Sequence, residues 1–152
     1  MKKSGILHSE LMGALTALRH TDAIAILDVG MPLPLGCRVI DLALIRGIPS
    51  LLDVIKAVLG EIIVEKFTVF EPMIRLNNEM YNTLCGLMPS QQKGAVSAEG
   101  FQEELKKAKV CVRTGEYGMC CNVILYSASG LELYSDMYNV ECSKAQFRPQ
   151  RA

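Results

Sequence analysis

The chain has 152 residues, of which half are hydrophobic and 21% are charged, with 16 basic and 16 acidic side chains. This composition excludes a disordered chain and supplies one sizeable core, while the length is short for two ordinary domains. Because the charges balance, neither nucleic acid nor an anionic membrane surface is favoured as a partner. A neutral small ligand fits this balance better.

The six cysteines are scattered without a C-x-x-C pair, and the chain has only two histidines, so no metal site is expected. Lys2 and Lys3 imitate the start of a signal peptide, but Ser9 and Glu10 interrupt the apolar stretch that follows. No apolar run approaches the length of a membrane span. We therefore expect a soluble, cytoplasmic protein with reduced thiols and no membrane association.

The first part of the chain predicts a helix, a buried strand and a loop. Ser9 can cap a helix over about residues 10–19, where apolar side chains recur at helical spacing. Residues 23–27 form a short continuous apolar run, which is typical of a strand buried on both faces. Two prolines and a glycine break the stretch 31–36, which is therefore predicted to be a loop at the rim of a pocket.

Helices and strands alternate through the rest of the chain. Ser50 and Asp53 have the spacing of a capping box, at the start of a helix over about 51–59. The other expected elements are a strand over 61–70, helices over 78–87 and 98–107 with a loop containing Pro89 and Gly94 between them, and strands over 110–113 and 122–126. This order predicts an α/β fold built on a layered sheet. The pattern becomes polar after Gly130, so the domain is placed at 1–130, with a C-terminal extension of unknown role at 131–152.

His20 and Asp28 form the first candidate site. Asp28 directly follows the strand predicted at 23–27, and ligands of layered α/β sheets tend to bind beyond the carboxyl ends of strands. His20 precedes the same strand by a short turn. The alternative is structural, since a histidine that ends a helix can simply complement the helix dipole, and an aspartate after a strand can simply cap a turn.

Asn122 is a second candidate, because its amide could offer both a donor and an acceptor to a polyol. It could equally bond to backbone at the start of its strand. Strand periodicity would place Cys120 and Asn122 on one side and Cys121 on the other. The adjacent thiols suggest redox chemistry, but no Lys or His lies in this turn to activate them, so packing is the expected role.

Five segments in order give a more specific signal: Leu18–Asp22, Asp28–Pro34, Arg38–Leu44, Gly47–Ser50, and Arg113–Glu116 with Asn122 shortly after. Over about residues 1–130 this series resembles the D-ribose pyranase branch of the D-ribose pyranase and L-fucose mutarotase family. The resemblance implies a three-layer α/β/α fold with a mixed, mainly parallel sheet of about six strands. It also implies a ring-shaped homo-oligomer, typically a homodecamer, with sites near subunit interfaces.

The resemblance also implies roles for the candidate residues. His20 matches the family's proton donor, whereas Asp28 and Asn122 match positions that contact the sugar. Opening a cyclic hemiacetal requires a proton to reach the ring oxygen while another leaves the anomeric hydroxyl, and histidine, which titrates near neutrality, suits both transfers. Nothing is oxidised in such a reaction, so no cofactor is expected.

Three positions depart from the family pattern. Ala98 stands where the family has a histidine, Gln102 where it has a lysine, and Cys120 where it has a tyrosine; all three are expected to line the pocket. The main hypothesis is an isomerase that interconverts the ring and anomeric forms of a free monosaccharide such as D-ribose or L-fucose. The alternatives are a non-catalytic sugar-binding or regulatory ring on the same scaffold, and a purely structural assembly without ligand.

Overall fold

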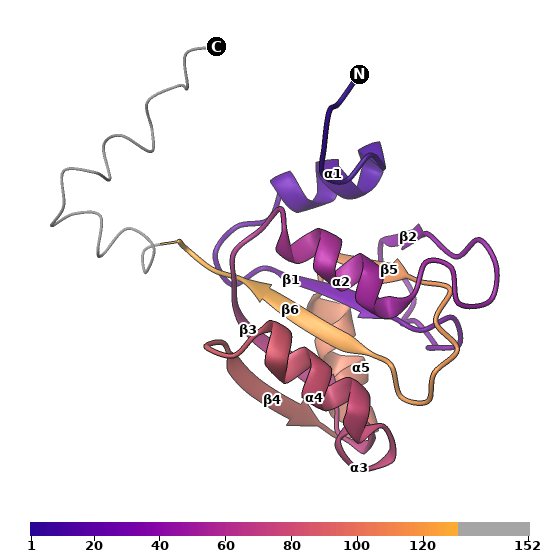
Figure 1. The fold of residues 1–152 in the computed structure, drawn as a ribbon. Coiled ribbons are helices and arrows are strands. Elements are labelled where there is room, and N and C mark those ends of the chain that lie inside the picture. Colours follow the sequence, from indigo (N-terminus) through magenta and orange to yellow (C-terminus); the bar gives the residue numbers. More distant parts are fainter. Residues whose placement is uncertain (131–152) are drawn as a thin grey trace, which may run out of the picture.

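The structure is a computed structural model that describes residues 1–130, arranged as helices on both faces of one sheet (Figure 1). The extension expected over 131–152 lies outside the described residues. In the described part, no helix is both long enough and apolar enough to cross a membrane.

Within residues 1–130, six strands form the sheet, in the order β2-β5-β1-β6-β3-β4. They are β1 (Ala23–Leu27), β2 (Val39–Asp41), β3 (Val64–Phe70), β4 (Gln92–Val96), β5 (Val110–Arg113) and β6 (Val123–Ser127). Strand β6 runs antiparallel to its neighbours β1 and β3, whereas the β1–β5, β2–β5 and β3–β4 pairs are parallel. The expected mixed, mainly parallel sheet of six strands is confirmed.

The helices divide between the two faces of the sheet. They are α1 (Ser9–Thr16), α2 (Leu51–Leu59), α3 (Pro72–Leu76), α4 (Asn78–Leu87) and α5 (Ala98–Lys107). Figure 1 shows α2 and α4 on the near face and α5 on the far face. Two core clusters follow from this division, because Ile24 and Ile26 of β1 face the cluster of α1, α2 and α4, whereas Ala25 and Leu27 face the cluster of α5. All five residues of β1 are buried, as expected for a strand covered on both sides.

Local signals in the sequence account for several boundaries. The capping box at α2 is present, since the Ser50 hydroxyl accepts from the Asp53 N–H (3.2 Å) and the Asp53 carboxylate accepts from the Ser50 N–H (3.1 Å). The hydrogen bonds from Ser50 lower the pKa of Asp53. Ser97 caps α5, and the helix covers the predicted residues 98–107.

The first helix differs from the prediction at both ends. It begins at Ser9 and its cap is His8, whose Nδ1 accepts from the Leu11 N–H (3.2 Å), so the prediction of Ser9 as the cap is wrong. It ends at Thr16 rather than near Arg19. The Arg19 N–H donates to the Asp22 carboxylate (2.9 Å), which holds this segment in a turn instead of a further helical turn.

Three elements were not predicted, and one strand is shorter than expected. The loop predicted around Gly94 is instead β4, an edge strand whose exposed Gln92 and Lys93 give it little hydrophobic signal. Helix α3 and the three-residue strand β2 are too short to show a period. Strand β3 begins at Val64, because residues 61–63 belong to the turn after α2.

Candidate functional site

A pocket of about 470 Å³ lies at the edge of the sheet where β1 and β3 end. Strand β6 is antiparallel to both, so its amino end begins at this same edge and brings the residues before it to the ends of the other two strands. The amino end of α5 closes the other side. The lining residues come from all four places: Asp28, Gly30, Met31, Pro32, Phe70, Ala98, Phe101, Gln102, Cys120 and Asn122.

Asp28 and Asn122 form a hydrogen-bonded pair in this pocket. The Asn122 Nδ2 donates to the Asp28 Oδ2 (2.6 Å), and the Asp28 backbone N–H donates to the Asn122 Oδ1 (3.1 Å). The second carboxylate oxygen of Asp28 accepts from the Gly30 N–H (3.0 Å). Asn122 is 3% exposed. These contacts fix both side chains and leave one amide N–H of Asn122 and further lone pairs of both groups for a ligand.

Cys120 lies beside this pair, in a left-handed backbone conformation with φ of 57°. Burial and the neighbouring Asp28 carboxylate raise the pKa of the Cys120 thiol, which keeps it protonated and unreactive near neutral pH. Cys121 packs in the core, where burial raises its pKa to about 12. Cys120 lines the pocket and also contacts the core cluster that contains Cys121, and β6 starts only at Val123, so the alternation expected of a strand does not apply to these two residues.

The first turns of α5 form the opposite wall of the pocket. Ala98 is the first residue of this helix and Gln102 lies one turn later. The Gln102 Nε2 donates to the Pro32 carbonyl (3.0 Å) and contacts the Met31 sulfur (3.7 Å), which ties the helix to the loop after β1. Between them Phe101 is buried and meets Phe70 edge to face, with ring centroids 6.0 Å apart.

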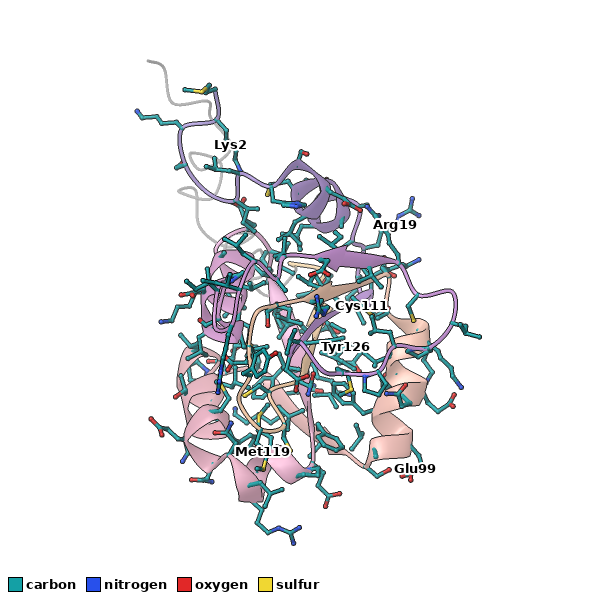
Figure 2. The ribbon with its side chains drawn as sticks, turned by 90° about the vertical axis from the view of Figure 1, so that its right-hand side faces the viewer. Lys2, Arg19, Glu99, Cys111, Met119 and Tyr126 are labelled. Carbon is teal, nitrogen blue, oxygen red and sulfur yellow. The ribbon has the colours of Figure 1, made fainter. Side chains whose placement is uncertain are left out.

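His20 is not among the residues that line this pocket. It lies in the turn before β1, whereas Asp28 follows the strand, and a five-residue strand spans roughly 16 Å at about 3.3 Å per residue. Figure 2 labels Arg19, the neighbour of His20, in the upper part of the view, and Glu99 and Met119, which are next to pocket residues in the sequence, in its lower part. Within one chain the structure therefore does not bring His20 and Asp28 together.

At its own end of the sheet, His20 pairs with a carboxylate. Its Nε2 lies 3.0 Å from the Glu65 Oε2, and the His20 side chain is 54% exposed. Glu65 orients the ring and leaves Nδ1 directed away from this contact. An exposed imidazole held by a carboxylate is accessible to a partner.

The segment Arg113–Glu116 supports the pocket without lining it. The Thr114 hydroxyl donates to the Leu27 carbonyl (2.8 Å) at the end of β1, and the Arg113 Nε donates to the Val29 carbonyl (3.1 Å). The Glu116 carboxylate accepts from the backbone N–H groups of Tyr117 (3.0 Å) and Gly118 (2.7 Å). These bonds hold the loops next to the pocket, which gives this polar segment a structural role close to Asp28 and Asn122.

Sequence reasoning missed the apolar residues of the pocket and the partner of His20. Phe70 is the last residue of β3, and β3 points in the same direction as β1, so the carboxyl ends of both strands lie at the same end of the sheet. The predicted strand also ended at residue 70, so its last residue could have been considered for the pocket. Phe101 was visible only as a residue between Ala98 and Gln102 on the same helix. No local signal connects Glu65 with His20, because the contact joins positions 45 residues apart.

Comparisons with known proteins agree with this architecture. A D-ribose pyranase of Bacillus cytotoxicus is 41% identical over 127 residues, which cover 84% of this chain and 97% of the relative. The structure of Bacillus subtilis RbsD complexed with D-ribose is 38% identical, with a TM-score of 0.81, over 84% of this chain and 98% of that chain. A fucose mutarotase from Streptococcus pneumoniae in complex with L-fucose shares the fold at 22% identity and a TM-score of 0.62, over 78% of this chain and 91% of that chain. Residues 1–129 match the RbsD / FucU transport protein family, and the chain belongs to that family.

Proposed function

We propose that the chain is a sugar pyranase or mutarotase, an isomerase that needs no cofactor and interconverts the ring and anomeric forms of a free monosaccharide such as D-ribose. The observation that carries this proposal is the Asp28–Asn122 pair, held at 2.6 Å in a pocket that a small molecule can enter. The 41% identity to a D-ribose pyranase supports the same reaction class. Asp28 and Asn122 would hold sugar hydroxyls so that the opened aldehyde recloses in place.

In this proposal His20 moves the proton. Its imidazolium protonates the ring oxygen as the bond from that oxygen to the anomeric carbon breaks, and the neutral imidazole then accepts the proton that the anomeric hydroxyl loses as the aldehyde forms. Reclosure on either face reverses these steps, so atoms and charge balance without an oxidant. Glu65, 3.0 Å from the imidazole, would hold the ring in a fixed orientation.

His20 and Asp28 lie at opposite ends of strand β1. We therefore propose that each working site combines the pocket of one copy with His20 of a neighbouring copy. The exposure of the His20 side chain supports this arrangement. Leu44, Ile45 and Ile48 form an exposed apolar group on one loop, which is typical of a surface that another protein covers. We propose that the copies form a homodecameric ring. Sedimentation velocity tests this, because it should then give a mass ten times that of one chain.

Co-expression of two inactive variants tests the shared site. His20→Ala lacks the proton donor, and Asp28→Asn keeps the shape of the pocket but loses its carboxylate. Mixed oligomers that contain both chains should regain a fraction of the activity, because some sites then combine an intact His20 with an intact Asp28. Oligomers that mix freely and stay inactive would contradict the shared site.

Magnetisation-exchange NMR tests the reaction itself, with D-ribose and L-fucose as first substrates. The wild-type chain should increase exchange between the sugar forms, and His20→Ala should remove most of the increase. His8→Asn is the matched control, because asparagine also caps a helix and His8 lies outside the pocket. An exchange rate that is equal in wild type and His20→Ala would contradict the role of His20.

The second candidate is a non-catalytic sugar-binding ring. Ala98 and Cys120 favour it, since neither side chain offers the pocket a strong hydrogen bond. Sugar binding without any acceleration of exchange, in wild type and His20→Ala alike, would support it.

We propose that the protein works in the cytoplasm. The five cysteines within residues 1–130 are free thiols, which suits a reducing compartment.

A further inference from the structure

The polar side chains of the pocket are concentrated on one side. Asp28 and Asn122 supply the polar groups at the ends of β1 and β6. The Gln102 amide nitrogen already contacts Pro32 and Met31. Among the described residues of α5 that line the pocket, the Gln102 Oε1 is therefore the one side-chain acceptor left for a ligand. The rest of the described lining is apolar or sulfur-bearing, and it includes Phe70 and Phe101.

This asymmetry has a cost for an ordinary sugar. A pentose carries a hydroxyl on nearly every carbon, and a hydroxyl pressed against an apolar wall loses its water without gaining a partner. The penalty disappears if the group that meets the wall is itself apolar. The wall formed by Phe70, Ala98 and Phe101 therefore selects against a hydroxyl at the position that faces it.

The reaction decides which part of the sugar faces the wall. The anomeric carbon and the ring oxygen have to meet the proton-transfer group, and the neighbouring hydroxyls have to reach Asp28 and Asn122. The side of the ring away from the anomeric carbon, with its exocyclic carbon, is then the part left for the wall of α5 and Phe70.

We infer that the preferred substrate is an aldofuranose whose exocyclic carbon carries hydrogen or a small alkylthio group instead of a hydroxyl, with that group seated against Phe70, Ala98 and Phe101. The inference rests on the proposed function and specifies its substrate class. Such a sugar cannot form a pyranose, because the hydroxyl that would close the larger ring is missing. Its reaction is the exchange of the two furanose anomers through the open aldehyde.

A panel of three sugars with the full chain tests this inference: D-ribose, 5-deoxy-D-ribose and 5-S-methyl-5-thio-D-ribose. Dissociation constants come from calorimetry, and anomer exchange comes from NMR. A single methylene in an apolar pocket changes specificity by roughly tenfold or more, so we expect the methylthio sugar to bind about tenfold more tightly than D-ribose, with the deoxy sugar between them.

Variants at the wall give the second arm. Ala98→Ser adds a hydroxyl at the first position of α5, where serine is tolerated, and should reduce the preference for the methylthio sugar over D-ribose. Ala95→Ser is the matched control, since Ala95 is exposed on the edge strand β4 and does not line the pocket. It should leave the preference unchanged.

The outcomes separate the two proposals. If exchange is faster for all three sugars and D-ribose has the same dissociation constant as the other two, the substrate class is overturned and the proposed reaction stands. Tight binding of the methylthio sugar without faster exchange would support the substrate class and overturn the reaction. No binding and no acceleration with any sugar would overturn both.

Discussion

Replacing Asn122 by aspartate tests the geometry of the polar pair directly. The substitution keeps the size of the side chain but exchanges the Nδ2 donor, 2.6 Å from the Asp28 Oδ2, for a second carboxylate oxygen. Asn122 is buried, so water cannot easily replace the lost donor. Two carboxylates this close cannot both remain ionised, and the pair should retain one proton.

The magnitude follows from the cost of that proton. An aspartate ordinarily titrates near pH 4, and each pH unit corresponds to about 1.4 kcal/mol, so protonating one carboxyl at pH 7 costs about 4 kcal/mol. The pKa of the new pair in the folded state lies above its unfolded value. The stability of the variant is therefore retained below the unfolded pKa and is lost, at about 1.4 kcal/mol per unit, as the pH rises from the unfolded pKa up to the folded pKa.

Urea unfolding followed by far-UV circular dichroism measures this effect, at several pH values between about 4.5 and 8. Asn122→Asp should approach the free energy of unfolding of the wild type at the acid end and fall about 4 kcal/mol below it near pH 7. Asn122→Ala is the control, because it loses the same hydrogen bonds without adding a titrating group. Parallel pH profiles for the two variants would refute the direct contact between positions 28 and 122.

Three other predictions concern the scaffold and the thiols. Gly115→Ala places a Cβ against the Ile48 carbonyl oxygen, so we expect a loss of about 3 kcal/mol in the free energy of unfolding, and a wild-type urea midpoint would contradict the close packing. Ser50→Ala should cost about 1 kcal/mol. Because Ser50 lowers the pKa of Asp53 in the folded state, the capping contribution is present above the unfolded pKa of Asp53, and the gap between wild type and variant should narrow as the pH falls through the folded pKa. Burial raises the pKa of Cys121 to about 12, so iodoacetamide at pH 8 should leave it unmodified in the native protein, and mass spectrometry that finds it alkylated as fast as in urea would contradict this.

The sequence predicted the central elements of the fold because their signals are local and strong. Strand β1 is a pure apolar run between polar ends, and α2 has a capping box followed by a clear hydrophobic face. Strand β4 was missed because an edge strand needs no buried side and its residues 92–95 carry little apolar surface. The cap of α1 was misassigned by one residue, because a neutral histidine can accept the bond that serine usually accepts.

For the site, the limit lay in topology. That Asp28 follows a strand could be read directly, but its contact with Asn122 depends on β6 entering the sheet next to β1 in the opposite direction, which no local pattern indicates. The sequence distance from His20 to Asp28 is short, yet a strand separates them and places them at opposite edges. Closeness along a chain that passes through a strand therefore means separation in space.

The position of β6 also has a consequence for how the molecule is assembled. Without this strand, the sheet divides into two groups of parallel strands, β2-β5-β1 and β3-β4. In each group the strand that would pair with β6, which is β1 or β3, then has one unpaired edge. Among the strands of residues 1–130, β6 is the last to leave the ribosome, so these two edges stay open until nearly all of this region has been synthesised. The nascent protein is then most vulnerable to pairing with the wrong partner just before β6 joins the two groups of strands.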